Sequence, residues 1–288
     1  MSLTINKKVL IVGLGLIGGS YARGLTEKGY FVGAIDANGE SIDYALKNGI
    51  IKEGSTEVKE EFLSKYDLII FCLYPLVFLD WIKNNQDKIK KNAIITDVTG
   101  VKCSVVYEVQ SRLRKSRKDI EFIPHHPMAG KEVYGVKNSD ADIFRGANFI
   151  ITPTSENSSE GIEVIKELGN VLGFRKVSIL TPAEHDEMIG FLSQLTHLIA
   201  VSLMTSKESK HLVDFTGDSF RDLTRIAKIN EDMWTELFLM NKNELLGQMD
   251  LFIGQIKKMR DALAIDDIET MKEMMKLSTE RRKYFDEK

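Results

Sequence analysis

The chain has 288 residues, of which 43% are hydrophobic and 28% charged, and its formal net charge is −3. This composition is that of an ordinary globular protein, and the length fits one large domain or two medium ones. The small negative charge gives no basic surface for nucleic acid, so we expect no nucleic-acid partner. Two cysteines, Cys72 and Cys103, cannot build a disulfide framework or a zinc cage, so we expect no metal and a reducing, cytoplasmic location.

No membrane segment is expected. The N-terminus, MSLTINKK, lacks the apolar region of a signal peptide. The longest near-apolar stretch, Met188–Met204, is interrupted by Ser193, Gln194, Thr196 and His197, whereas a membrane span needs roughly 20 predominantly apolar residues. We therefore interpret it as a buried helix and expect no membrane partner.

Up to about residue 181, short apolar runs alternate with polar, helix-like segments. The runs are KVLIVG, YFVGAID, YDLIIFCLY, NAIITDVT, EFIPH, NFIITP and KVSIL. Continuous apolar runs suit strands that are buried on both faces, as in a parallel sheet covered by helices. Residues 1–181 are therefore predicted to form a doubly wound α/β domain.

From Pro182 onward the strand-like runs disappear and apolar residues take helical spacing. The spacing is clearest in a heptad-like seam of Trp234, Phe238, Leu245, Met249, Phe252, Ile256, Met259 and Leu263, with one gap at Asn241. A seam of this length fits either a long core helix of one subunit or a dimer interface. We favour the interface, so residues 182–288 are predicted to be an all-helical substrate and dimerisation domain of a homodimer.

The segment GLGLIG places Gly13, Gly15 and Gly18 in the pattern G-x-G-x-x-G, after a strand-like run and before a helix-like one. In that context the pattern predicts a dinucleotide site of the Rossmann type, with phosphates at the helix N-terminus. Asp36 ends the second strand run, where a carboxylate binds a ribose diol and repels a 2′-phosphate, so NAD is the expected cofactor. The full expected set is Gly13, Leu14, Gly15, Leu16, Ile17, Gly18, Asp36, Leu73, Tyr74, Pro75 and Thr99.

An enzyme that removes a hydride from an alcohol also needs a base for the hydroxyl proton, and a neutral histidine serves near pH 7. Of the five histidines, His125 and His126 end an apolar strand run, where open α/β sheets bind ligands. His197 lies in the apolar helix, where a histidine is more often a core residue. We interpret His185 as a capping or surface residue and His211 as exposed.

The motifs GLGLIGGS, HPMAG and TRIA…MW, in this order and spacing, closely resemble the prephenate/arogenate dehydrogenase family of tyrosine biosynthesis, from Lys8 to about Asn243. The resemblance implies oxidative decarboxylation of prephenate to 4-hydroxyphenylpyruvate, or of arogenate to tyrosine. The C4 hydroxyl loses its proton, C4 gives a hydride to the nicotinamide, and CO2 leaves from C1.

The resemblance also implies roles for particular residues. His126 of HPMAG hydrogen-bonds the C4 hydroxyl, and Arg225 binds a substrate carboxylate, as a guanidinium can do with two parallel hydrogen bonds. His197 becomes a substrate contact and joins His126 in the expected catalytic set. Glu132, Lys131, Arg221 and Trp234 complete the expected substrate site, although Trp234 serves equally well as a core anchor.

The chain departs from the family pattern at Gly100. Many members carry a serine there that contacts the catalytic histidine and the substrate, whereas this chain reads DVTGVK. Thr99 or a water is the candidate replacement, or else this branch positions the histidine differently. Asp218 and Glu132 would add negative charge that favours the ammonium of arogenate, while Arg221, Arg225 and Lys228 argue for prephenate, which stays the first choice.

Two further interpretations remain. A β-hydroxyacid dehydrogenase or imine reductase has the same architecture, but usually carries a lysine in the equivalent catalytic helix, where this chain has Gln194 and His197. A non-catalytic NAD-binding sensor would keep the fold without the chemistry. Gly100 favours the sensor, whereas His126, His197 and Arg225 together favour the enzyme.

Overall fold

The computed structural model describes residues 3–208 and 210–286. By its internal contacts the chain divides into two compact units, Met1–Asn241 and Lys242–Lys288. The expected division between residues 181 and 182 into a nucleotide domain and a helical domain remains a prediction.

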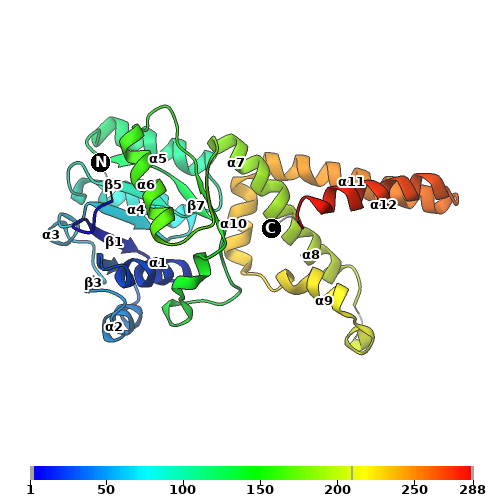
Figure 1. The fold of residues 1–288 in the computed structure, drawn as a ribbon, viewed down its shortest axis with the longest axis horizontal. Helices are drawn as coiled ribbons and strands as arrows, with labels where there is room; N and C mark the ends of the chain where they lie inside the picture. The colour runs from blue at the N-terminus through cyan, green and yellow to red at the C-terminus, as the bar shows by residue number, and fades with distance from the viewer. Residues whose placement is uncertain (1–2, 209, 287–288) are drawn as a thin grey trace. The chain divides into compact units, whose positions relative to one another are not determined.

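The first sheet has the strand order β3-β2-β1-β4-β5-β6, with every neighbouring pair parallel. It is the blue-to-cyan sheet in Figure 1, where β1, β3 and β5 are labelled. Its strands are β1 (Lys8–Val12), β2 (Phe31–Ile35), β3 (Glu53–Ser55), β4 (Leu68–Phe71), β5 (Ile94–Asp97) and β6 (Glu121–Phe122). The predicted Rossmann-like sheet is confirmed. The sequence does not predict β3, because its residues Glu-Gly-Ser contain no apolar run.

Helices cover both faces of this sheet. They are α1 (Leu16–Glu27), α2 (Gly39–Lys47), α3 (Glu60–Leu63), α4 (Pro75–Asn85), α5 (Cys103–Ser116) and α6 (Ser159–Val171), with short turns η1 (Gln86–Lys88), η2 (Val136–Asn138) and η3 (Ala141–Phe144). Along β1, Val9 and Ile11 join one buried apolar cluster, whereas Leu10 and Val12 join the other. This alternation of side chains across a strand explains why the run is apolar at every position.

The predicted strand EFIPH is two strands. β6 ends at Phe122, and after Pro124 the chain enters β7 (His125–Pro127), which pairs antiparallel with β8 (Asn148–Ile151); β9 (Lys176–Ile179) completes this second sheet. Pro124 has no N–H to donate to a ladder, which favours a break at this point. His125 and His126 therefore lie on the second sheet and not at the end of a strand of the first.

The chain after residue 181 is helical, as predicted. Within the first unit the elements are α7 (Pro182–Ile189), the π-helix η4 (Gly190–Leu195), α8 (Thr196–Thr205), η5 (Lys210–Phe215), α9 (Asp218–Thr224), η6 (Arg225–Ala227) and α10 (Glu231–Met240). The run Pro182–Thr205 is long and apolar enough to cross a membrane by length and composition, and only 28% of its most apolar window is buried. The expectation of a buried helix is thus wrong for this chain, in which Phe191 and Leu192 are exposed.

The predicted apolar seam is interrupted. α10 ends before Asn241, and α11 (Lys242–Ala264) begins after it, so the seam belongs to two helices. The buried amide of Asn241 donates to the carbonyl oxygen of Asp186 at 2.9 Å and to Gln194 Oε1 at 2.8 Å, which ties the end of the first unit to α7 and η4.

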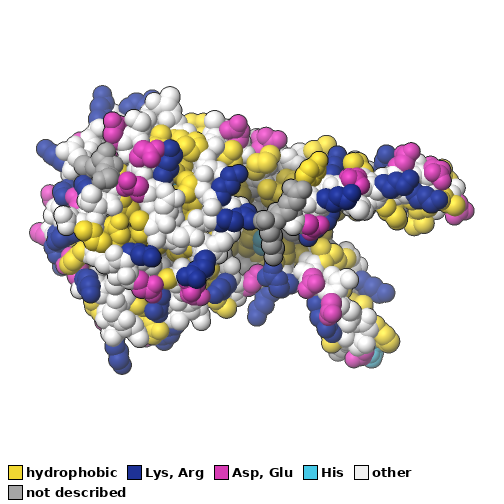
Figure 2. All heavy atoms as spheres, in the orientation of Figure 1, with side chains coloured by type: hydrophobic (Ala, Val, Ile, Leu, Met, Phe, Trp, Pro, Cys, Tyr) yellow, Lys and Arg dark blue, Asp and Glu magenta, His cyan; other side chains and the backbone are white. Residues whose placement is uncertain are grey.

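The second unit, Lys242–Lys288, contains α11 and α12 (Ile268–Lys283), which pack against each other. Asp267 caps α12 through a hydrogen bond from the Thr270 N–H. Leu251, Ile256 and Leu263 of α11 are exposed, and hydrophobic side chains are visible on this helical pair in Figure 2.

Candidate active site

The glycine loop between β1 and α1 has the shape that a dinucleotide requires. Gly13 has a φ of +97°, and a Cβ there would lie 2.5 Å from the carbonyl oxygen of Cys72. A Cβ at Gly18 would lie 1.8 Å from the carbonyl oxygen of Gly13, so α1 can approach the loop only without one. At Gly15 a Cβ would meet nothing within 4 Å, so the space before the N-terminus of α1 stays open.

The other expected cofactor residues surround this loop. Asp36 follows β2, and its carboxylate accepts hydrogen bonds from the N–H groups of Leu14 (2.5 Å) and Asn38 (2.8 Å). Each carboxylate oxygen keeps a lone pair for a ribose hydroxyl. Leu73, after β4, lies against Gly13, and Tyr74 and Pro75 begin α4. These residues fit a dinucleotide, although their role as its ligands stays a prediction.

His126 lies at the same edge of the sheet as this loop. Gly13, Leu73 and Gly100 follow the carboxyl ends of β1, β4 and β5, which are neighbours in the sheet. A Cβ at Gly100 would lie 3.8 Å from Cε1 and 3.9 Å from Nε2 of His126. The Cε1–Nε2 edge of this ring therefore faces Gly100, at the crevice where doubly wound sheets bind ligands.

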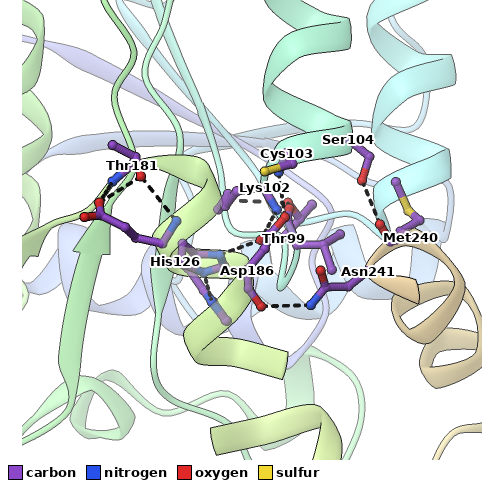
Figure 3. A network of polar contacts seen from close by, with 12 residues as sticks. Thr99, Lys102, Cys103, Ser104, His126, Thr181, Asp186, Met240 and Asn241 are labelled. Carbon is purple, nitrogen blue, oxygen red and sulfur yellow. Dashed lines mark hydrogen bonds and ion pairs between the residues drawn. The ribbon is translucent and has the colours of Figure 1, made fainter. Parts of the chain in front are cut away.

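The other ring nitrogen of His126 belongs to a chain of polar contacts. His126 Nδ1 lies 2.9 Å from His185 Nε2, and His185 Nδ1 lies 2.8 Å from Asp186 Oδ1. Asp186 also accepts the N–H groups of Lys102 and Cys103, both at 2.8 Å, at the N-terminus of α5 (Figure 3). His185 is fully buried, whereas part of the surface of His126 remains accessible. The interpretation of His185 as a capping or surface residue is wrong, because Thr181 caps α7.

The surroundings hold these imidazoles neutral. Burial lowers the pKa of His126 well below its usual value, a positive charge on His185 would lower it further, and Lys102 adds to this. Burial also lowers the pKa of His185, although the bond to Asp186 opposes it. Burial alone would raise the pKa of Asp186, but the hydrogen bonds from His185 and Cys103 outweigh it and lower the pKa. A neutral His126 can accept a proton near pH 7.

Thr99 does not contact His126. Its hydroxyl bonds to Asp97 and to the carbonyl oxygen of Val101. Asp97 forms a fully buried ion pair with Lys102, whose Nζ lies 2.8 Å from Asp97 Oδ2 and donates to the carbonyl oxygen of His125 at 2.6 Å. The hydroxyl of Thr99 is thus engaged within its own loop and is not the group that orients His126. The expected role of Thr99 beside the cofactor remains a prediction.

A second group of expected residues meets at α8 and α10. The rings of His197 and Trp234 have centroids 3.8 Å apart. His197 Nδ1 lies 2.9 Å from the carbonyl oxygen of Ser193, so it donates, and the neutral ring keeps a lone pair on Nε2. Leu237, three residues after Trp234 on α10, would lie 3.6 Å from a Cβ at Gly100. The face of α10 thus links the His197 group to the His126 group.

Arg225 and Glu132 form an ion pair on the exposed side of this group. Both carry charge close enough to affect the pKa of His197, which is lowered mainly by burial. Arg221 pairs instead with Asp218 at 3.3 Å, and Lys131 with Asp140 at 3.2 Å. The structure therefore brings Arg225, Glu132, His197 and Trp234 together, but gives Arg221 and Lys131 other partners.

Comparison with known proteins identifies the architecture. A family model described as the nucleotide-binding domain of prephenate dehydrogenase matches residues 21–178, and one described as its dimerization domain matches residues 181–277. The chain belongs to the prephenate dehydrogenase family. The family's two domain models follow one another along the chain, from the middle of α1 onward, and together they cover His126 and the helices that carry His197 and Arg225.

Individual relatives agree with this membership. A prephenate dehydrogenase of Bacillus subtilis is 31% identical, over 95% of this chain and 75% of its own length. A cyclohexadienyl dehydrogenase of Zymomonas mobilis is 28% identical, over 97% of this chain and 96% of its own length. A crystal structure of prephenate dehydrogenase from A. aeolicus, in complex with hydroxyphenyl propionate and NAD+, has a TM-score of 0.89 at 29% identity and covers 99% of this chain and 100% of that one. This chain is accordingly a dehydrogenase of the prephenate/arogenate type.

Two residues at this family site, His185 and Asp186, were not expected there. A signal for them is present in the sequence. Pro182, His185, Asp186 and Ile189 are the buried residues of α7, with the spacing i, i+3, i+4 and i+7 of one helix face. A polar pair on the apolar face of a helix needs buried partners, and here the partners are His126 and the first N–H groups of α5.

Proposed function

We propose that this chain oxidises prephenate to 4-hydroxyphenylpyruvate and CO2 with NAD. The observation that carries the proposal is the geometry of His126. Its ring is neutral and partly accessible, its Nδ1 is engaged by His185, and its Nε2 edge faces the carboxyl edge of the sheet beside the glycine loop. A base in that position can take the proton of a hydroxyl group held over the nicotinamide.

The cofactor is NAD. The open space at Gly15 and the N-terminus of α1 fit its pyrophosphate, and Asp36 fits an unphosphorylated ribose. The similar A. aeolicus enzyme has NAD+ bound. When bound, NAD accepts the hydride that leaves C4.

The side chains of the protein then have separable tasks. His126 Nε2 accepts the C4 hydroxyl proton, which directs electrons into the new C–O double bond as the hydride leaves. Arg225 releases Glu132 and binds a substrate carboxylate in its place. That exchange costs little, because the two side chains are 63% and 44% exposed, and exposed ion pairs contribute only about 0 to 1 kcal/mol. Trp234 and His197 form the wall of the site on the α8 and α10 side.

The charge balance supports prephenate over arogenate. The argument for arogenate needs unpaired negative charge from Glu132 and Asp218. In the structure Glu132 pairs with Arg225 and Asp218 with Arg221. Asp218 is thus already neutralised, and Glu132, which the exchange frees, stands beside the positive charge of Arg225, so the keto acid stays the preferred substrate.

We also propose a cytoplasmic homodimer that associates through the C-terminal helices, with a nucleotide domain in residues 1–181 and a helical domain in residues 182–288. Apolar side chains such as Phe191, Leu192, Leu251 and Ile256 are exposed in the single chain, as is typical of a protein–protein interface. They lie within residues 181–277, which match the family's dimerization domain. Sedimentation equilibrium is the test, and a monomer at micromolar concentration would contradict the dimer.

The function is tested by initial rates of NADH formation with prephenate and with arogenate, each with NAD and with NADP. We expect the highest kcat/KM for prephenate with NAD, and a loss of at least about 100-fold for His126→Asn, since a general base contributes roughly that much. His211→Asn, at an exposed histidine, is the matched control. A preference for arogenate would overturn the substrate, and NAD binding without turnover of either substrate would favour a sensor.

A further inference from the structure

The His185–Asp186 pair stands behind His126 and has no place in the reaction described so far. His185 is fully buried, and Asp186 is almost fully buried, 2% exposed. Neither side chain can reach a substrate except through His126. His185 contacts His126 at Nδ1, whereas the Cε1–Nε2 edge of the ring faces Gly100.

The hydrogen-bond chain can be followed from its charged end. Asp186 is ionised, because it accepts two N–H groups at the N-terminus of α5, where a negative charge is also favoured by the helix dipole. His185 Nδ1 must therefore carry the proton that it shares with Asp186 Oδ1. In the neutral ring, His185 Nε2 then has a lone pair and accepts.

The same logic fixes His126. Facing an acceptor at 2.9 Å, His126 Nδ1 must be the protonated nitrogen, and in a neutral ring Nε2 is then unprotonated. This is the tautomer that a general base at Nε2 requires. With the opposite tautomer, two lone pairs would face each other between the histidines, and Nε2 would present a hydrogen to the substrate hydroxyl.

We propose that His185 and Asp186 are positioning residues, which hold His126 as the Nδ1–H tautomer and stabilise the imidazolium formed when Nε2 takes the substrate proton. This rests on the proposed role of His126 as the base. In that step the substrate O–H bond breaks and an Nε2–H bond forms, while the Nδ1–H stays bonded to His185. The arrangement supplies from the Nδ1 side an orientation of the ring that Gly100, which has no side chain, cannot supply from the Nε2 side.

Other charged groups near His126 do not provide this function. Lys102 disfavours a positive charge on the ring, but its Nζ is engaged with Asp97 and with the carbonyl oxygen of His125. The ring of His125 bonds through Nε2 to Tyr21 and through Nδ1 to Thr96, at 2.7 and 2.6 Å. Among the described residues, His185 is the partner of His126 Nδ1.

The test compares His185→Leu with His185→Gln. Leucine removes the acceptor, whereas the glutamine amide can accept from His126 and donate to Asp186. For His185→Leu we expect kcat to fall about 100-fold, with KM for prephenate and NAD within about twofold. The acidic limb of the kcat/KM profile should move to lower pH, since the imidazolium loses an acceptor. His185→Gln should restore most of kcat and return the limb toward its original position.

His211→Leu is the matched control, and thermal melts with NAD titrations show that each variant is folded. Imidazole ¹⁵N shifts of the free enzyme, assigned with the variants, report the tautomer of His126 independently of turnover. An Nε2–H tautomer, an unmoved acidic limb, or equal losses of kcat in the two variants would overturn the inference. If the wild-type protein turned over no substrate, the proposed function would fail, while the ¹⁵N shifts would still decide whether His185 fixes the tautomer.

Discussion

Replacing Lys102 with methionine should be among the most damaging single changes in the nucleotide domain. Lys102 and Asp97 are both fully buried, and their charged atoms lie 2.8 Å apart. Lys102→Met keeps most of the side-chain volume but leaves the Asp97 carboxylate without a countercharge. Asp97 Oδ1 already lacks a hydrogen-bond partner among the described residues, so the structure offers no obvious substitute.

Breaking one partner of a buried pair costs about 3 to 5 kcal/mol. The carbonyl oxygen of His125 also loses its donor, so we expect the upper half of that range. This is a large part of a total stability of about 5 to 15 kcal/mol. At about 2 to 4 °C per kcal/mol, Tm should fall by roughly 10 °C or more.

The assay is urea denaturation followed by far-UV circular dichroism, without NAD, for the wild type, Lys102→Met and the double variant Lys102→Met/Asp97→Asn. The second change removes the uncompensated charge but keeps an acceptor for the Thr99 N–H. The double variant should therefore be more stable than the single one by about 2 kcal/mol. A Lys102→Met loss below about 1 kcal/mol, or a double variant less stable than the single one, would refute the reasoning.

Three other predictions concern the site. Gly100→Ser should leave kcat within about threefold and add about 0.5 kcal/mol of stability, since a Cβ would lie at least 3.6 Å from its neighbours; melts and initial rates check this, and unfolding would contradict it. Burial lowers the pKa of His125, His126 and His185 in the folded state, so the unfolded chain binds more protons below about pH 6.5. As the pH is lowered below that value, the free energy of unfolding should therefore decrease, by up to about 1.4 kcal/mol per pH unit for each ring. Urea midpoints that do not change with pH would contradict this. Arg225→Lys should raise KM for prephenate about tenfold with a smaller effect on kcat, because a lysine cannot bind a carboxylate with two parallel bonds; an unchanged KM would remove Arg225 from the substrate site.

The parallel sheet and the glycine loop could be predicted from the sequence because their signals are local. A continuous apolar run such as the one in β4 records burial on both faces, and G-x-G-x-x-G records a turn that excludes side chains. The split between β6 and β7 was harder to see, since EFIPH reads as one run and only Pro124 marks the break.

The same local signals could not predict contacts between segments that are far apart in the sequence. His185 comes to His126 across 59 positions of the sequence, and Asp186 reaches the N-terminus of α5 across 84. Sequence spacing shows that His185 and Asp186 share a face of α7, but it does not say which strand that face will meet. The role of Arg221 at the substrate stays a prediction: its charge suits a carboxylate, and Asp218, three residues away, is its partner in the structure.

The π-helix Gly190–Leu195 sets the rotational phase between two parts of the site. It joins α7, which carries His185 and Asp186, to α8, which carries His197. A π turn accommodates one residue more than an α turn, so deleting a single residue there would allow one regular helix to run through. After such a deletion α8 would keep nearly its present phase, whereas winding the same six residues as a regular α-helix would turn α8 by about 100° around the helix axis relative to α7. With that regular winding His197 would leave Trp234 while His185 stayed on His126, so the π turn, by taking up one extra residue, keeps both histidines directed at the same site.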